Sequence, residues 1–145
     1  MTRLTYAKML SADDVDISYI TKYYENPKVS HFLSIGDNYF SYVTGTENVH
    51  FYKVYSNETL VGVVHLEKQK TSLFLSVLVF PEFQKMGFGT RIIDDVKKDV
   101  FGLDYDRIEV SVDEKNTASL RLFKNAGFTE GSKQDELINF TYIIE

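Results

Sequence analysis

Residues 84–90 read Gln84-Lys85-Met86-Gly87-Phe88-Gly89-Thr90 and lie between the most apolar run of the chain and an amphipathic pattern. In the run before them, residues 73–80, both faces are apolar, which is typical of a strand buried between two layers. The pattern after them predicts a helix that ends near Gly102 and has one apolar stripe, made by Ile92, Ile93, Val96 and Val100. The stretch is therefore a glycine-rich turn from a central strand into a helix.

Two glycines allow this turn to bend tightly and to point consecutive backbone N–H groups in one direction. Such amides, together with the dipole of the following helix, favour a phosphate or pyrophosphate group. Neither common nucleotide motif is complete: Ile92 stands where the dinucleotide fingerprint needs a third glycine, and Gly89-Thr90-Arg91 stands where a P-loop needs Gly-Lys-Ser/Thr. The stretch predicts an anion-binding loop, and the alternative is a turn that holds no ligand.

Several elements are expected before the central strand. Leu4–Met9 predicts a first strand, and Ser11 with Asp14 resembles a capping box that opens a helix ending near Glu25. Asn26-Pro27 predicts a second, short helix that runs through Leu33. Residues 49–55 and 60–67 alternate on either side of a turn, which predicts a β-hairpin leading into the central strand.

After the central helix the pattern predicts a strand over 108–112, a helix over 117–126 and a closing strand over 138–144. The crossover between residues 73 and 112 is parallel and right-handed if both strands share a sheet. We therefore expect an α/β fold with a mixed, mainly antiparallel central sheet, one parallel strand pair and flanking helices. No linker or repeat divides residues 1–145, which predicts a single domain.

The composition excludes several classes of function. The chain has 145 residues, 16 Lys+Arg against 21 Asp+Glu, a net charge of −5 and no Cys, so thiolate zinc sites, iron–sulfur clusters and cysteine nucleophiles are excluded. It has no basic cluster typical of nucleic-acid binding, and no apolar run approaches the roughly 20 residues of a membrane span. We expect a soluble cytoplasmic protein, a monomer or homodimer, that binds neither nucleic acid nor a membrane and holds no metal.

Two blocks of residues carry a more specific pattern. The first is Val79-x-Pro81-x-x-Gln84-x-x-Gly87-x-Gly89, and the second is Asn116-x-x-Ser119-x-x-Leu122-Phe123-x-x-x-Gly127-Phe128. Together they resemble the GCN5-related N-acetyltransferase (GNAT) family, whose acetyl-CoA loop reads Gln/Arg-x-x-Gly-x-Gly/Ala. The predicted order of elements fits that family along nearly the whole chain. The resemblance implies the acyl-CoA N-acyltransferase fold and transfer of an acetyl group from acetyl-CoA to a primary amine in a ternary complex.

The resemblance also implies a cofactor site made largely of backbone. Around the CoA pyrophosphate it implies the backbone amides of Gln84, Lys85, Met86, Gly87, Phe88, Gly89 and Thr90. It implies that backbone groups of Leu78 and Val79 pair with the pantetheine arm, and that the last helix lines the cofactor with Asn116, Ser119, Phe123 and Lys124. From the residues alone, Asn116 also suits a plain N-cap, and Ser119 and Phe123 also suit packing positions.

The catalytic side chains depart from the family pattern. Many members carry Tyr as the proton donor to the leaving thiolate where this chain has Phe123, and Glu at positions that correspond to Leu73 and Ser111. The nearest carboxylates, Glu67 and Glu109, are the candidate general bases, and the alternative is that both are solvated carboxylates of the sheet. These departures leave open a second function, a non-catalytic acyl-CoA-binding or regulatory module.

The amine acceptor, a small molecule or a peptide, is expected to meet the variable residues 24–42 and the tail. Aromatic residues are dense there: Tyr23, Tyr24, His31, Phe32, Tyr39, Phe40 and Tyr42. This density predicts either an aromatic-walled cleft or a core beneath a long loop. The three histidines form no metal-spaced pair, and we regard His65 only as a position worth mutating.

Overall fold

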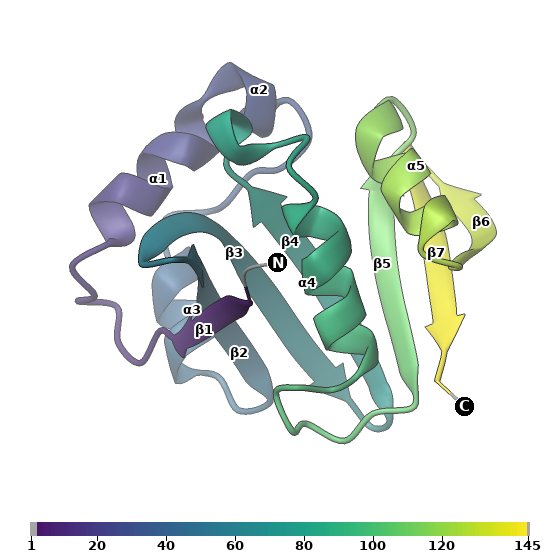
Figure 1. The fold of residues 1–145 in the computed structure, drawn as a ribbon, viewed down its shortest axis with the longest axis horizontal. Coiled ribbons are helices and arrows are strands. Elements are labelled where there is room, and N and C mark those ends of the chain that lie inside the picture. Colours follow the sequence, from purple (N-terminus) through teal and green to yellow (C-terminus); the bar gives the residue numbers. More distant parts are fainter. Residues whose placement is uncertain (1–2, 145) are drawn as a thin grey trace. The chain divides into compact units, whose positions relative to one another are not determined.

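The computed structural model describes residues 3–144, and the chain divides into two compact units (Figure 1). The first unit comprises Met1–His65 with Val77–Gln84, and the second comprises Leu66–Ser76 with Lys85–Glu145. Seven strands are hydrogen-bonded neighbours in the order β1-β2-β3-β4-β5-β7-β6. β4 and β5 pair in parallel, whereas β1–β2, β5–β7 and β6–β7 pair antiparallel. The predicted mixed sheet with one parallel pair is confirmed.

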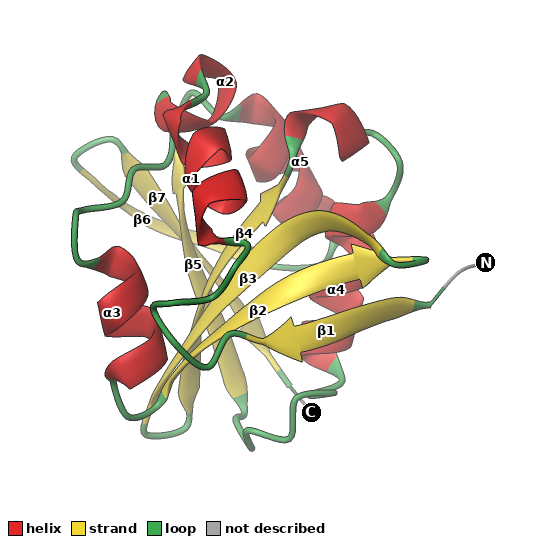
Figure 2. Cartoon of the chain, turned by 90° about the vertical axis from the view of Figure 1, so that its left-hand side faces the viewer, coloured by secondary structure: helices red, strands yellow, loops and turns green. Residues whose placement is uncertain are grey.

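The first unit packs three helices on one face of its strands. Its elements are β1 (Leu4–Lys8), α1 (Ile17–Glu25), α2 (Pro27–Ser30), α3 (Tyr39–Gly45), β2 (Val49–Ser56), most of β3 (Thr59–Gln69), the end of β4 (Ser72–Val79) and the 3₁₀ turn η1 (Pro81–Phe83). Figure 2 shows α1, α2 and α3 gathered along one side of β2 and β3. Their shared core contains Met9, Ile20, Tyr24, Val29, Val43, Val49, Phe51, Val63, Leu78 and Phe80.

Three expectations for the first unit need correction. α1 begins at Ile17 rather than at a capping box, because Ser11 Oγ and Asp14 Oδ1 accept from amides two residues on and form local turns. α2 is capped by Asn26 as predicted but ends at Ser30 rather than Leu33. α3 was not predicted, because only Val43 of that helix is buried and its apolar pattern is too short to show a period.

The second unit contains α4 (Phe88–Lys97), β5 (Arg107–Asp113), α5 (Thr117–Asn125), β6 (Thr129–Gln134) and β7 (Leu137–Ile143). Ile92, Ile93 and Val96 are buried as predicted, but Val100 is 52% exposed because α4 ends at Lys97. α5 ends as predicted at Gly127, where the amide of Phe128 donates to the Phe123 carbonyl at 3.0 Å and closes a Schellman turn.

The face of β4 that carries Phe74 differs from the prediction. Leu73 and Leu75 are buried, whereas Phe74 is 37% exposed, so this part of β4 is not buried on both faces. The register gives the reason, because Leu73 pairs with buried Ile108 while Phe74 pairs with the carboxylate residue Glu109. One face of the parallel pair is therefore apolar, and the other is partly polar. Among residues 3–144, no helix has the length and apolar character that crossing a membrane requires.

Candidate functional site

In the second unit, the glycine-rich turn leads into α4 in a conformation that exposes backbone amides. Gly87 is the N-cap of α4 with φ +84°, and Lys85 also has positive φ, at +65°. The amide of Arg91 makes the helix's first bond to a carbonyl four residues back, that of Gly87, at 3.1 Å. The amides of Phe88, Gly89 and Thr90 therefore occupy the first turn, where a helix offers them no carbonyl. This arrangement suits an anion.

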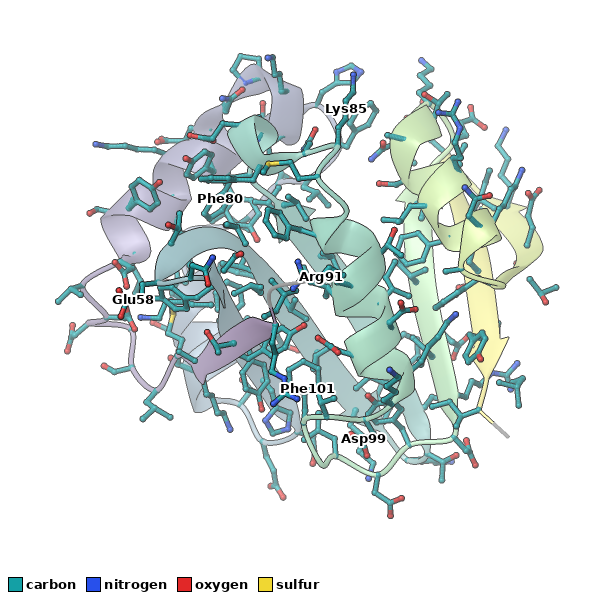
Figure 3. The ribbon with its side chains drawn as sticks, in the orientation of Figure 1. Glu58, Phe80, Lys85, Arg91, Asp99 and Phe101 are labelled. Atoms are coloured by element: carbon teal, nitrogen blue, oxygen red, sulfur yellow. The ribbon has the colours of Figure 1, made fainter. Side chains whose placement is uncertain are left out.

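Side chains around this turn leave its backbone accessible. Lys85, Met86, Gly87 and Thr90 are exposed, and no atom lies within 4 Å of the position that a Cβ on Gly87 would take. Figure 3 shows Lys85 before α4 and Arg91 on its first turns. The Arg91 guanidinium lies 5.7 Å from the centre of the Phe88 ring. Two cationic side chains thus accompany the helix N-terminus.

Gly89 has a different role from Gly87. A Cβ on Gly89 would lie 3.1 Å from Leu122 Cδ2, so this glycine permits α4 and α5 to approach each other. The two glycines of the motif therefore serve backbone conformation and helix packing, respectively.

In the first unit, the end of β4 lies unusually close to β3. The amide of Phe80 donates to the Val61 carbonyl at 2.9 Å, and a Cβ on Gly62 would lie only 2.3 Å from the Leu78 carbonyl oxygen. Only glycine fits there. Because the Leu78–Val79 peptide is trans, its N–H points away from its C=O and hence away from Gly62.

Gln84, the first residue of the motif, folds back on the same strand. Its side chain is exposed, and Nε2 donates to the Val79 carbonyl at 3.0 Å. The side chain thus fixes the end of β4 within the first unit.

On α5, the predicted cofactor-lining residues have structural roles. Asn116 is the N-cap, and its Oδ1 accepts from the Ser119 amide at 3.3 Å. Ser119 is half-buried, and Phe123 is 4% exposed with its ring 5.2 Å from that of Phe128. In the second unit, Asn116 is therefore a helix cap and Phe123 a core residue, which are the alternatives to cofactor contact that the sequence left open.

The two candidate carboxylates belong to the second unit and are half-buried. Glu109 of β5 pairs with Phe74 on one side and with Thr141 of β7 on the other. Glu67 of β3 lies five residues before the first residue of β4, Ser72, across a turn in which Lys70 has φ +58°. A two-residue turn between Gln69 and Ser72 brings Glu67 opposite Phe74. The two carboxylates thus lie on either side of the exposed Phe74 ring.

The aromatic residues of positions 23–42 belong mostly to the core of the first unit. Tyr24 is buried, and Tyr23, Leu33, Tyr39 and Phe40 pack against the same core. Of the two alternatives, this favours a core beneath a long loop, although Tyr42 is 43% exposed. Burial raises the pKa of the Tyr24 hydroxyl well above its usual range, so this phenol remains protonated.

Tyr23 joins α1 to the 3₁₀ turn. Its ring stacks on Phe80 at 3.8 Å, and its hydroxyl donates to Glu82 Oε2 at 2.7 Å (Figure 3 labels Phe80). Burial, the Tyr19 hydroxyl and the Glu82 carboxylate all raise the pKa of Tyr23. The segment just before the glycine-rich turn is therefore held to α1.

The sequence singled out Tyr39 and His65 separately but did not predict that they pair. The hydroxyl of Tyr39, the first residue of α3, lies 2.7 Å from Nδ1 of His65 on β3. The Tyr39 hydroxyl also hydrogen-bonds to Tyr24 on α1. Helix α3, which the sequence pattern does not predict, brings Tyr39 to this position. The only signal in the sequence is that His65 lies two residues after Val63 and therefore points to the same face of its strand.

Comparison with known proteins gives a family match over most of the chain. The model of the Acetyltransferase (GNAT) family matches residues 16–128. A search of curated protein sequences found no match. Within residues 3–144, no group of three or more His, Asp or Glu side chains is placed to hold a metal ion.

Several solved structures share the fold. A domain from Methanocaldococcus jannaschii is 17% identical over 99% of both chains, with a TM-score of 0.84. The Campylobacter jejuni N-acetyltransferase PseH in complex with acetyl coenzyme A is 14% identical over 99% of this chain and 100% of its own, with a TM-score of 0.79. Spermidine N-acetyltransferase from Vibrio cholerae, in complex with CoA and spermine, is 15% identical over 97% of this chain and 95% of its own, with a TM-score of 0.80.

Proposed function

Because this chain belongs to the Acetyltransferase (GNAT) family, we propose that it is an N-acetyltransferase that moves the acetyl group of acetyl-CoA directly onto a primary amine. The observation that carries the proposal is the start of α4. There, first-turn amides follow a left-handed Gly87 beside an exposed Lys85. A pyrophosphate is the kind of group that such an arrangement binds.

The residues of the turn fit a CoA pyrophosphate. Three amides, those of Phe88, Gly89 and Thr90, face outward in the first turn of α4, and the open space beside Gly87 admits a ligand atom. We propose that Gln84, Lys85, Met86 and Gly87 complete this loop. We also propose that Leu78 and Val79 pair with the pantetheine arm, and that Asn116, Ser119 and Phe123 lie along the cofactor. Acetyl-CoA, as co-substrate, supplies the activated acetyl group.

The proposed reaction needs few side chains. An ammonium group loses a proton to a base, and its nitrogen then attacks the thioester carbonyl, forming the C–N bond. The C–S bond breaks, and the thiolate takes the second proton that the nitrogen loses, while the base returns its proton to solvent. The products are an amide, CoA thiol and one released proton.

Backbone supports the transition state in this proposal. The Val79 N–H points away from Gly62 of β3, so it is suited to donate to the oxyanion of the tetrahedral intermediate. We propose that water relays the nitrogen's second proton to the thiolate, because the buried ring of Phe123 has no proton to give. Among the carboxylates, Glu67 and Glu109, on either side of Phe74, are the candidate bases.

The acceptor is proposed as a primary amine of a small molecule or a peptide. The similar structures include a spermidine N-acetyltransferase and an N-acetyltransferase for an alanine of a ribosomal protein, so the fold serves acceptors of both kinds. The half-buried carboxylates Glu67 and Glu109 suit a cationic amine, since opposite charges attract most strongly where solvent is partly excluded.

Calorimetry with acetyl-CoA tests the proposal directly. We expect saturable binding of acetyl-CoA and CoA to the wild-type protein and at least tenfold weaker binding to Gly87→Ala, because a Cβ at φ +84° strains the turn. Gly36→Ala, in open space, is the matched control. Failure of the wild type to bind either nucleotide at millimolar concentration would overturn the proposal.

A second candidate function is a non-catalytic acyl-CoA-binding or regulatory module. The burial of Phe123, at the position where a proton donor is common in the family, favours it. It predicts acetyl-CoA binding without turnover. Release of free thiol from acetyl-CoA in the presence of any amine from a broad panel would exclude it.

A further inference from the structure

We infer that His65 is the catalytic base that takes the proton of the acceptor ammonium, and that Tyr39 is the positioning residue that holds its ring for this step. The inference rests on the proposed acetyltransferase function. It starts from the 2.7 Å hydrogen bond between the Tyr39 hydroxyl and His65 Nδ1, which lies entirely within the first unit.

The imidazole is enclosed by α3 on one side. Tyr39 and Tyr42 are three residues apart on this helix and therefore share a face. Their ring centres lie 5.6 and 6.4 Å from that of His65. His65 is only half-buried, so the site is sheltered without being closed.

The contacts of the Tyr39 hydroxyl allow the tautomer that a base requires. The hydroxyl of Tyr39 contacts both His65 Nδ1 and the buried Tyr24 hydroxyl, and it has a single proton to donate. When that proton goes to Tyr24, the Nδ1–H of His65 donates to the Tyr39 oxygen. Nε2 then carries the lone pair, and a proton reaches it directly or through a water or side chain that bridges to it.

The position of His65 suits the proposed reacting atoms. Val61 of β3 lies opposite Phe80, and Val63 and Leu78 share one core, so their side chains are on the same face. His65 follows Val63 on that face and is a diagonal neighbour of Leu78, roughly 7 Å away between Cα atoms. The Leu78–Val79 peptide is the group proposed to hold the oxyanion. His65 is thus a titratable side chain of the first unit close to that peptide.

The other titratable groups near the ring make the pH argument specific. Tyr39 and Tyr42 face it from α3, Tyr24 reaches it through Tyr39, and Glu67 lies two positions further along β3. Among these types of side chain, imidazole is the one whose ordinary pKa lies near neutral pH. An imidazole therefore accounts for any ionisation near neutral pH.

Protons and electrons balance in this step. His65 removes one proton from R–NH3+, becomes an imidazolium and later returns the proton to solvent. The nitrogen lone pair that is released forms the C–N bond, and the electrons of the C–S bond leave with the thiolate. No oxidant, reductant or metal is required.

The test compares pH profiles of kcat/KM for thiol release with a reactive primary amine. In the wild type we expect an acid limb between about pH 6 and 7, as is ordinary for imidazole, and His65→Gln removes this limb and lowers kcat about 100-fold at pH 7.5. Tyr39→Phe shifts the limb and lowers kcat about tenfold, because a base loses efficiency when its tautomer is no longer fixed. His50→Gln, on β2 with Nδ1 near Lys8 Nζ, leaves rate and limb unchanged.

Two further measurements separate the possible failures. Calorimetry with CoA tests the proposed function independently of the role of His65. His65→Gln should bind CoA with an affinity within about twofold of that of the wild type. In the acetyl-CoA complex, the Cε1–H NMR resonance that His65→Gln removes should titrate between about pH 5 and 8, and Tyr39→Phe should shift its midpoint. An acid limb that persists in His65→Gln but disappears in Glu67→Gln or Glu109→Gln overturns the inference, as does a His65 resonance that does not titrate.

Discussion

The two units handle polar groups in opposite ways. The first unit places ionisable side chains in or beside its core: Lys53 is 9% exposed and pairs with Asp14 and Asp16, and His65 lies under two tyrosines. In the second unit, backbone amides are exposed at the start of α4, after Gly87, and the Asn116 side chain caps the start of α5. Side chains that titrate suit proton transfer, whereas fixed amides suit anion binding. The comparison shows two ways of placing polar groups: ionisable side chains packed beside a core in the first unit, and exposed amides at the start of α4 in the second.

The strongest way to break this comparison is Gly62→Ala in the first unit. The added Cβ would lie 2.3 Å from the Leu78 carbonyl oxygen, which is backbone and cannot move aside cheaply. We expect a loss of about 3 kcal/mol in the free energy of unfolding, as for overpacked cores. Urea denaturation measures it, with Gly36→Ala as the control, since nothing lies within 4 Å of that Cβ. A loss below about 1 kcal/mol would show that β3 and β4 adjust freely there.

Phe123→Tyr tests whether the second unit lacks a proton donor at this position of α5. The ring is 4% exposed and packs on Phe128 and Phe140, so the new hydroxyl enters an apolar core. We expect about 2 kcal/mol of destabilisation and no increase in kcat, because an unsatisfied buried hydroxyl is costly. Thermal unfolding and thiol release measure the two effects. A faster enzyme would mean that this position does supply the leaving thiolate with a proton.

Asp14→Asn tests the buried ion cluster of the first unit through pH. Burial alone would raise the pKa of Asp14, but the Asp16 amide and the Lys53 ammonium lower it further than burial raises it. A depressed carboxyl pKa stabilises the fold above the unfolded value of about 4, and this contribution disappears as the pH falls through the folded value. We expect Asp14→Asn to lose about 1.5 kcal/mol at pH 7 and to flatten the acid side of the stability curve. Denaturation between about pH 2 and 7 measures this; an unchanged acid slope would contradict it.

The smallest expected effect is at Asn116, where two substitutions distinguish helix capping from contact with CoA. Asn116→Ala removes the N-cap of α5 and should cost about 1 kcal/mol, whereas Asn116→Asp keeps a capping oxygen and should cost almost nothing. If the side-chain amide also contacts CoA, Asn116→Asp weakens CoA binding despite normal stability. Calorimetry and thermal unfolding of the same two variants distinguish a cap from a cap that also binds the cofactor.

The predictability of the chain differs between the units for physical reasons. In the second unit, glycines and caps act locally, so Gly87, the stop at Gly127 and the buried stripe of α4 were predictable from neighbouring residues. Phe74 was misjudged, because its exposure depends on Glu109 of another strand. In the first unit, the bond between Tyr39 and His65 joins residues 26 positions apart, and no periodicity records such a contact. The roles of Glu67 and Glu109 remain predictions.

A practical consequence arises from the way the backbone is divided between the units. The chain passes from one unit to the other at residues 65–66, 76–77 and 84–85, so each unit is assembled from two separate stretches of polypeptide. A single cut after Gln84 keeps the first unit whole on one fragment but leaves residues 66–76 of the second unit on that same fragment, so no single cut separates the two units. Circular permutation that opens the exposed turn at Gln69-Lys70 would place the new chain ends within residues 66–76, the shorter of the two stretches that build the second unit.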